Sequence, residues 1–247
     1  MASSSKSAYV IERDFRLFFA DKYMLVIMFV NFMIDLGVSG LSLGAMINNL
    51  GFSYFLYIAP GANLITATVA AFQSGRDVWR ERIIQDTQQY LLTLPIGRNL
   101  FVVSRLFSGM LRTVLTVLPG TIVIALLYRL SFEYFLVGLL IVFIYSGAVA
   151  GLSVAAASMA NSLELFATVR STAQVYLSFF STQFYPSSIL PPAIAVVSAF
   201  NPMTWAVQSF RALQVGTVDV GLLVPLGGLS GALLVAGFIL YRRTMVY

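Results

Sequence analysis

Long apolar runs, separated by short polar stretches, dominate the pattern of this chain. Six of the runs are long enough to cross a hydrocarbon core of roughly 30 Å at about 1.5 Å per helical residue. The strands of a β-barrel would instead alternate between apolar and polar residues in short segments. We therefore predict an all-α integral membrane protein, a single domain over residues 1–247 with six transmembrane helices. The predicted spans are residues 23–47, 54–72, 101–128, 132–159, 163–184 and 220–241.

The residues before the first run predict a helix that lies on the membrane surface. Over residues 1–22, apolar and charged side chains recur at helical spacing on two different sides, which is typical of an interfacial amphipathic helix. The apolar side carries Ile11, Phe15, Phe18 and Phe19, and the charged side carries Glu12, Arg13 and Arg16.

The apolar segment 186–219 cannot form one straight helix. Several prolines interrupt it, and a proline inside a helix removes a hydrogen bond and clashes with the preceding turn. We expect broken re-entrant helices here, two pieces that flank Asn201 and Pro202 and dip partly into the outer leaflet. Backbone that is broken at membrane depth must be buried in protein or face water.

The distribution of basic residues predicts the orientation. Six spans place both termini on one side, and all Lys and Arg residues except Arg129 and Arg211 then lie on or toward that side. Because basic residues in short loops favour the cytoplasm, both termini are expected to be cytoplasmic. The net charge of +5 therefore indicates topology and contact with lipid headgroups, and we expect no nucleic-acid partner.

Composition excludes several kinds of chemistry. Only 10% of the residues are charged and 59% are hydrophobic, whereas a soluble domain is about a quarter charged. The chain has no Cys and no His, which excludes disulfides, Cys or His metal sites, haem held by His and a Ser/His/Asp triad. Neither Lys6 nor Lys22 lies in GxxxxGK[ST], so any ATP that drives this protein is bound by another polypeptide.

The most polar stretch of the chain is 80–98, and the segment 75–94 predicts an amphipathic cytoplasmic helix between spans two and three. Pro95 and Gly97 end it. It is either a loop that rests on the headgroups or a helix whose polar face docks a soluble partner. The polar face carries Glu81, Arg82, Gln85, Asp86, Gln88 and Gln89.

Two motifs in this arrangement resemble the ABC-2 type permeases, the membrane subunits of ATP-driven exporters. One motif is Leu91-Leu92-Thr93-Leu94-Pro95 followed by Arg98. The other is Phe184-Tyr185-Pro186 with Leu190-Pro191, then Asn201-Pro202 followed by Arg211. Members commonly carry a Gly and a Glu at the positions that Asp86 and Gln89 occupy here.

The resemblance implies a transport subunit of the plasma membrane that is not itself an enzyme. Two copies, or this chain and a close paralogue, would pair, and each would rest on a separate ABC ATP-binding subunit that holds ATP and Mg. The segment 75–94 would be the coupling helix. The side chains expected to contact the ATPase are Asp77, Glu81, Arg82, Asp86 and Gln89.

The resemblance also implies a function. The expected one is export of a hydrophobic, lipid-linked or drug-like substrate by alternating access. A haem-exporter-like or glycan-exporting permease is an alternative, and so is a membrane scaffold without transport. An intramembrane enzyme would need paired acids, and Asp35 is the only acid that lies well within a predicted span.

A polar stripe in the first predicted span is the second candidate site. Asn31, Asp35, Ser39 and Ser42 recur every three or four residues and so share one side of an apolar helix. A carboxylate within a membrane span is costly and must face the bundle, water or a partner. The stripe is predicted to line the substrate pathway or the dimer seam; in the alternative reading, Asp35 is protonated and the stripe holds helices together.

Overall fold

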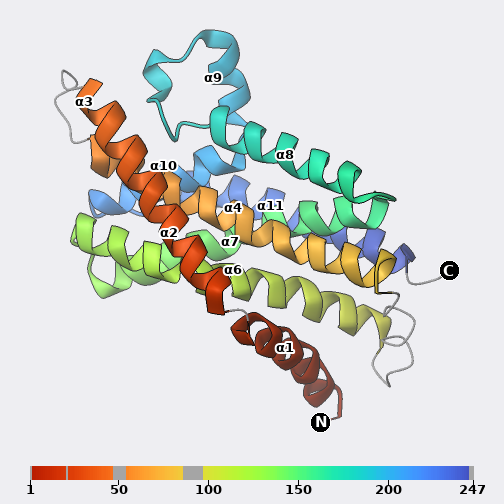
Figure 1. Ribbon diagram of the computed structural model, residues 1–247. Coiled ribbons are helices and arrows are strands. Elements are labelled where there is room, and N and C mark those ends of the chain that lie inside the picture. The colour runs from red at the N-terminus through yellow and green to blue at the C-terminus, as the bar shows by residue number, and fades with distance from the viewer. Residues whose placement is uncertain (1, 21, 47–53, 86–96, 245–247) are drawn as a thin grey trace.

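The protein is described by a computed structural model that places residues 2–20, 22–46, 54–85 and 97–244. Every regular element in these ranges is a helix (Figure 1). The all-helical prediction is therefore confirmed for the described residues. The long helices are α4 (Tyr54–Ile83), α6 (Arg98–Tyr128), α7 (Phe132–Met159) and α11 (Val220–Thr244). The shorter ones are α1 (Ala2–Ala20), α2 (Lys22–Val38), α8 (Leu163–Phe179), α9 (Pro192–Ala199) and α10 (Pro202–Gln214).

Helices α7 and α4 form the centre of the bundle. α7 packs against α11, α4 and α6, while α4 also packs against α6 and α2. Glycines let these backbones approach closely. A Cβ on Gly151 of α7 would lie 2.5 Å from the Leu233 backbone of α11, and one on Gly75 of α4 would lie 2.4 Å from the Ser153 carbonyl oxygen. No side chain fits at either crossing, so these glycines set the helix separations.

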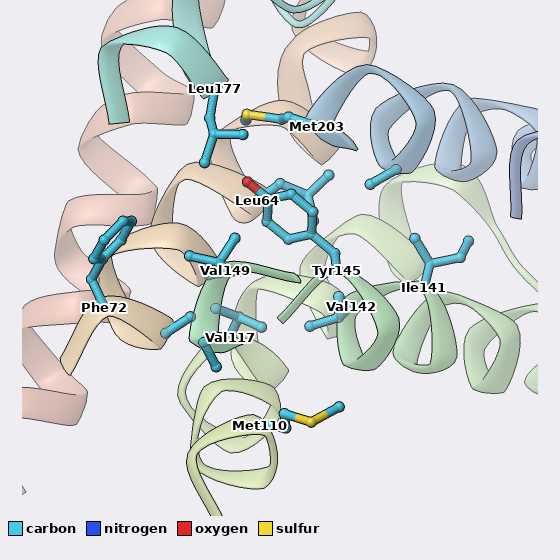
Figure 2. Close-up of a cluster of buried hydrophobic side chains, with 14 of the residues drawn as sticks. Leu64, Phe72, Met110, Val117, Ile141, Val142, Tyr145, Val149, Leu177 and Met203 are labelled. Atoms are coloured by element: carbon cyan, nitrogen blue, oxygen red, sulfur yellow. The ribbon is translucent and has the colours of Figure 1, made fainter. Parts of the chain in front are cut away.

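The hydrophobic core lies between α4, α6 and α7. Figure 2 shows Tyr145 of α7 in this cluster with Leu64 of α4. The Tyr145 hydroxyl lies 2.6 Å from Thr68 Oγ1, so its polar end has a partner although the ring is fully buried. Leu177 of α8 and Met203 of α10 cover the same cluster (Figure 2).

Five helices in the described ranges are long and apolar enough to cross a membrane. They are Leu25–Ser42, which comprises most of α2 and part of the π-helical turn η1 (Ser39–Leu43), and α4, α6, α7 and α11. Helix α8, in the fifth predicted span, has 17 residues and is about 25 Å long, which is short of the roughly 30 Å core. The prediction of six spans is therefore not confirmed.

The boundary predicted after the second span is wrong. The sequence pattern separates a span 54–72 from a helix 75–94, but α4 continues without a break from Tyr54 to Ile83. Nothing at this boundary interrupts a helix, because Gly75 is in helical conformation and fills a close crossing with Ser153. α4 ends at Ile83 and residues 84–85 form a turn, so the predicted coupling helix is not continuous; its remaining residues, 86–94, lie outside the described residues.

The proline-rich segment forms the two pieces that the sequence predicts. α9 and α10 flank Asn201, and each has a proline, Pro192 or Pro202, in its first turn. Proline is tolerated there because the first helical N–H groups have no partner within the helix. A short 3-10 turn, η2 (Ser187–Ile189), precedes them.

The bundle has two distinct ends. We call the α1 end the one that contains α1, the last turns of α4 and α11 and the first turn of α6, and the α9 end the one that contains α9, α10, the first turn of α4 and the last turn of α6 (Figure 1). α1 begins the described chain and the last turn of α11 ends it, and both belong to the α1 end. The two described chain ends therefore lie on the same side of the bundle (Figure 1).

The glycine crossing between α7 and α11 yields a stability prediction. A Cβ on Gly237 would lie 2.7 Å from the Gly151 carbonyl oxygen, whereas one on Gly231, in the same helix, would meet nothing within 4 Å. We expect Gly237→Ala to lower the unfolding free energy by about 1–3 kcal/mol through overpacking.

The control, Gly231→Ala, is expected to be neutral or to raise the unfolding free energy by up to about 1 kcal/mol, because alanine favours helix. Thermal unfolding of the purified variants in detergent measures both. Equal effects of the two substitutions would contradict the close crossing.

Candidate functional site

Four charged side chains meet at the α1 end of the bundle, and we call them the ionic cluster: Arg13, Asp14, Glu81 and Arg105. Glu81 Oε1, in the last turn of α4, lies 2.9 Å from Arg13 Nη2 of α1 and 2.9 Å from Arg105 Nη2 of α6. Arg105 also donates to Asp14 Oδ1 of α1. The cluster therefore joins α1, α4 and α6.

The ionic cluster is largely removed from water. The side chains of Arg105 and Asp14 are 5% and 2% exposed, and that of Glu81 is 13% exposed. Taking charges out of water is unfavourable, so the arrangement persists only because each guanidinium meets carboxylates with good geometry. Removing Arg105 would leave Asp14 and Glu81 with Arg13 as their remaining partner, and the Arg13 side chain is 33% exposed.

A cleft of about 460 Å³ opens beside the ionic cluster, between α1, α4 and α6. Arg112 of α6 crosses it: its Nη1 lies 2.9 Å from Asp77 Oδ2 of α4, and its guanidinium lies 5.4 Å from the centre of the Phe18 ring of α1. Arg76 and Arg80 of α4 also line the cleft and are exposed. Charged side chains of both signs thus face this opening.

The predicted ATPase-docking side chains have different surroundings in the structure. Glu81 belongs to the ionic cluster, and Asp77 pairs with Arg112. Arg82 donates to the carbonyl oxygens of Ser158 and Ala160, at the end of α7. These three side chains therefore have partners within the chain. The remaining two, Asp86 and Gln89, lie outside the described residues.

The polar stripe predicted on the first span lies at the edge of the exposed face of α2 and η1. Asn31 and Ser42 are exposed, whereas Asp35 and Ser39 are half-buried. The Ser42 hydroxyl donates to the Val38 carbonyl oxygen. No ion pair to Asp35 exists among the described residues. The structure thus brings the four side chains to one surface of this helix.

A second polar centre lies at the α9 end, and we call it the Arg211 cluster: Tyr57, Thr182, Gln183 and Arg211. The Arg211 guanidinium of α10 donates to the carbonyl oxygens of Tyr57, Thr182 and Gln183 at 3.0 to 3.2 Å. It also stacks on the Tyr57 ring, 3.5 Å from the ring centre, and the Tyr57 hydroxyl donates to the Thr182 carbonyl oxygen at 3.0 Å. The cluster therefore holds Thr182 and Gln183, which follow α8, against α4 and α10.

Asn201 connects α8 to α10. Its Nδ2 donates to the carbonyl oxygens of Tyr176 and Leu177, in the last turn of α8, at 3.0 and 3.2 Å. Its Oδ1 accepts from the Met203 N–H at 2.9 Å and so caps the start of α10. One buried side chain therefore satisfies backbone groups at the ends of two helices.

A comparison with known families identifies the chain. A model of the ABC-2 type transporter family matches residues 7–215, which include both clusters and Asn201. The chain belongs to the ABC-2 type transporter family. This finding confirms the family that the sequence motifs predict. A comparison with curated proteins gives no match.

Family membership supports four general statements about this ABC-2 protein. It is an integral membrane protein, because its apolar helices and its family agree. It is a membrane permease of an ABC-type transporter, and members of the family are transport subunits. The family implies partnership with an ABC ATP-binding subunit.

The sequence reasoning singled out neither cluster of this permease as a site. A signal for the ionic cluster was present, because Arg105 lies within an apolar run and a charge there needs a partner. Its partner Asp14 is distant in sequence, so spacing could not identify it. The motif residues Asn201 and Arg211 were noted, but their acceptors are backbone carbonyls, which no side-chain pattern reveals.

The ionic cluster predicts that replacing Arg105, which belongs to it, and replacing Arg16, which does not, will change the unfolding free energy by different amounts. We expect Arg105→Met to lower the unfolding free energy of the permease by about 3–5 kcal/mol, because Asp14 and Glu81 then lose a buried partner. Arg16→Met is the matched control, since Arg16 pairs with Glu12 four residues away on the surface of α1 and its side chain is 80% exposed.

The control should change the unfolding free energy by no more than about 0.5 kcal/mol. Unfolding of both variants in mixed micelles, followed by circular dichroism, measures the difference. If Arg105→Met were as mild as Arg16→Met, the ionic cluster would not stabilise the fold.

Proposed function

We propose that the chain is the permease subunit of an ATP-driven exporter in the plasma membrane. Two copies pair and move a hydrophobic, lipid-linked or drug-like substrate outward by alternating access, while ATP and Mg are held by a separate subunit. The linkage of Glu81 to Arg13 and Arg105 carries this proposal, because it ties the segment expected to dock the ATPase to the rest of the bundle. The export direction and the pairing come from the resemblance to ABC-2 exporters.

In this proposal the α1 end is cytoplasmic and the α9 end faces outward. The basic residues near the helix ends support this orientation, because such residues favour the cytoplasmic side of a membrane. Those toward the α1 end are Arg76, Arg80, Arg98, Arg242 and Arg243. Both termini are then cytoplasmic. Helix α8 serves as the fifth of six spans. The residues of the Arg211 cluster that follow α8, Thr182 and Gln183, complete its crossing of the membrane.

Motion of the docking segment would reach three helices at once. Residues 75–83 are the last turns of α4, and Glu81 there is bound by an arginine from α1 and another from α6. A displacement imposed by the ATPase would therefore shift these helices together. Two packings of the permease that bind the ATPase differently would then respond to nucleotide.

α4 extends this connection to the opposite end of the bundle. The helix has 30 residues and is about 45 Å long, and its first turns carry Tyr54 and Tyr57. The Tyr54 hydroxyl donates to the Phe184 carbonyl oxygen, and Tyr57 belongs to the Arg211 cluster. We infer that α4 transmits movement from the ATPase to the outward segment between α8 and α10.

The side chains proposed to contact the ATPase all belong to the segment 75–94, and we assign them different roles. Asp86 and Gln89 are proposed as direct contacts. Asp77, whose side chain is 35% exposed, can contact the ATPase while it pairs with Arg112. Glu81 and Arg82 are proposed to act chiefly by holding the segment against α1, α6 and α7.

Co-purification with the ATP-binding subunit tests the docking proposal. Asp86→Ala with Gln89→Ala is expected to weaken assembly about tenfold or more and to lower the stimulated ATP hydrolysis, because charged and polar contacts at the interface are lost. The unfolding temperature of the permease alone should not change.

Two further variants make the result specific. Glu133→Ala, exposed at the α9 end, should leave assembly unchanged. Arg82→Ala should lower the unfolding temperature, because it loses its contacts with α7. Normal assembly and hydrolysis in the Asp86→Ala and Gln89→Ala variant would refute the direct contacts.

The polar stripe is proposed to line the dimer seam or the substrate pathway. The chain has no cysteine, so single cysteines can report on this surface without background. Asn31→Cys and Ser42→Cys lie on the stripe, and Val26→Cys and Val30→Cys are controls at positions 61% and 45% exposed on the opposite, apolar side of the same helix.

A seam predicts disulfide-linked dimers from the stripe variants on mild oxidation. A pathway predicts labelling of the same variants by a membrane-impermeant maleimide, because the stripe then faces water. The two controls should give neither product. If the stripe variants behaved like the controls in both assays, neither role would hold.

A further inference from the structure

An apolar groove of about 280 Å³ lies on the outside of the bundle between α6 and α11. Its walls are partly open to the surroundings, since Val103, Phe107 and Val235 are 52%, 42% and 57% exposed. Every lining side chain is hydrophobic, so the groove suits a hydrocarbon chain. The lining residues are Val103, Leu106, Phe107, Met110, Leu234, Val235 and Phe238.

The groove continues toward two arginines at the α1 end. Phe238 also lines a second hollow of about 280 Å³, together with Ile239, Arg242 and Arg243. Residues 234, 238 and 242 occupy successive turns on one side of α11, and so do residues 235, 239 and 243. The arginines therefore lie about 6 Å along the helix axis beyond Phe238, in line with the groove.

The two guanidinium groups have no acidic partner in the described part of the chain. Both side chains are exposed, and none of the ion pairs of the structure includes Arg242 or Arg243. Arg13, Arg105 and Arg112 at the same end all pair with carboxylates. Two adjacent unpaired cations at the end of an apolar groove are complementary to a ligand with an anionic head and an apolar tail.

We propose that this groove and the two arginines bind one anionic phospholipid of the bilayer. An acyl chain occupies the groove, and the phosphate accepts hydrogen bonds from Arg242 and Arg243. The groove extends about 10 Å along α6, from Val103 to Met110, which accommodates part of one acyl chain. Basic pockets between transmembrane helices on the cytoplasmic side bind anionic lipid headgroups in this way.

Charge distinguishes this ligand from the other lipids that touch the protein. A zwitterionic lipid carries a cation next to its phosphate, and that cation opposes the field of two arginines. The proposal concerns a lipid bound to the outside of the permease. It therefore stands independently of the docking segment and of the transported substrate.

Native mass spectrometry of the purified whole chain tests the site by titration with phosphatidylglycerol and, separately, phosphatidylcholine of the same acyl chains. We expect the first phosphatidylglycerol to bind more tightly than phosphatidylcholine. Arg242→Gln with Arg243→Gln should lower that affinity about 25-fold, at about fivefold for each arginine near a membrane surface. The matched charge control is Arg129→Gln, an exposed arginine at the α9 end, which should change nothing.

A second pair of variants tests the groove. Val103→Trp fills it, and Ile122→Trp adds the same ring at a position 43% exposed on the same helix but outside the groove. Only Val103→Trp should lower phosphatidylglycerol binding, and neither should lower the unfolding temperature. Glycerol phosphate, which has no acyl chain, should fail to compete.

Three results would overturn the proposal. Equal affinity for the two lipids would show that the arginines do not select charge. Loss of binding in the arginine variant but not in Val103→Trp would reduce the site to surface attraction. Competition by glycerol phosphate would indicate a site for free phosphate in place of a lipid.

Discussion

A guanidinium group that leaves water must find all its hydrogen-bond acceptors inside the protein, and two arginines meet this requirement at opposite ends of the bundle. Arg105 is bound by the carboxylates of Asp14 and Glu81, which belong to two other helices. Arg211 is bound by backbone carbonyl oxygens, including that of Tyr57. Each arginine therefore fixes elements that are far apart in the sequence.

α4 contributes to both centres and so connects them. Glu81 in its last turn belongs to the ionic cluster, and Tyr57 near its start belongs to the Arg211 cluster. The glycine crossing at Gly75 holds its last turns against α7, where a larger side chain would not fit. A rigid helix with a polar contact at each end is a suitable element for passing movement through a permease.

Several features of the fold could be predicted because they depend on local pattern. The helical content, the long apolar helices, the two pieces around Asn201 and the family all followed from hydrophobic periodicity, prolines and motifs. The break expected before Gly75 was wrong, because amphipathic character changes there without a helix-breaking residue. The helix predicted over residues 163–184 ends at Phe179, because Asn201 binds the Leu177 carbonyl oxygen and Arg211 binds that of Gln183.

The sequence by itself determined where apolar helices form, that Cys and His side chains are absent, and which family the chain belongs to. Only the tertiary structure decided the partners of the charges. Asp14 and Arg105 meet because α1 folds back against α6, and Arg242 and Arg243 remain unpaired because no carboxylate of the described chain reaches them. The position of an apolar helix depends on the local sequence pattern, so it can be predicted from the sequence. The pairing of charges depends on which helices become neighbours, so only the tertiary structure shows it.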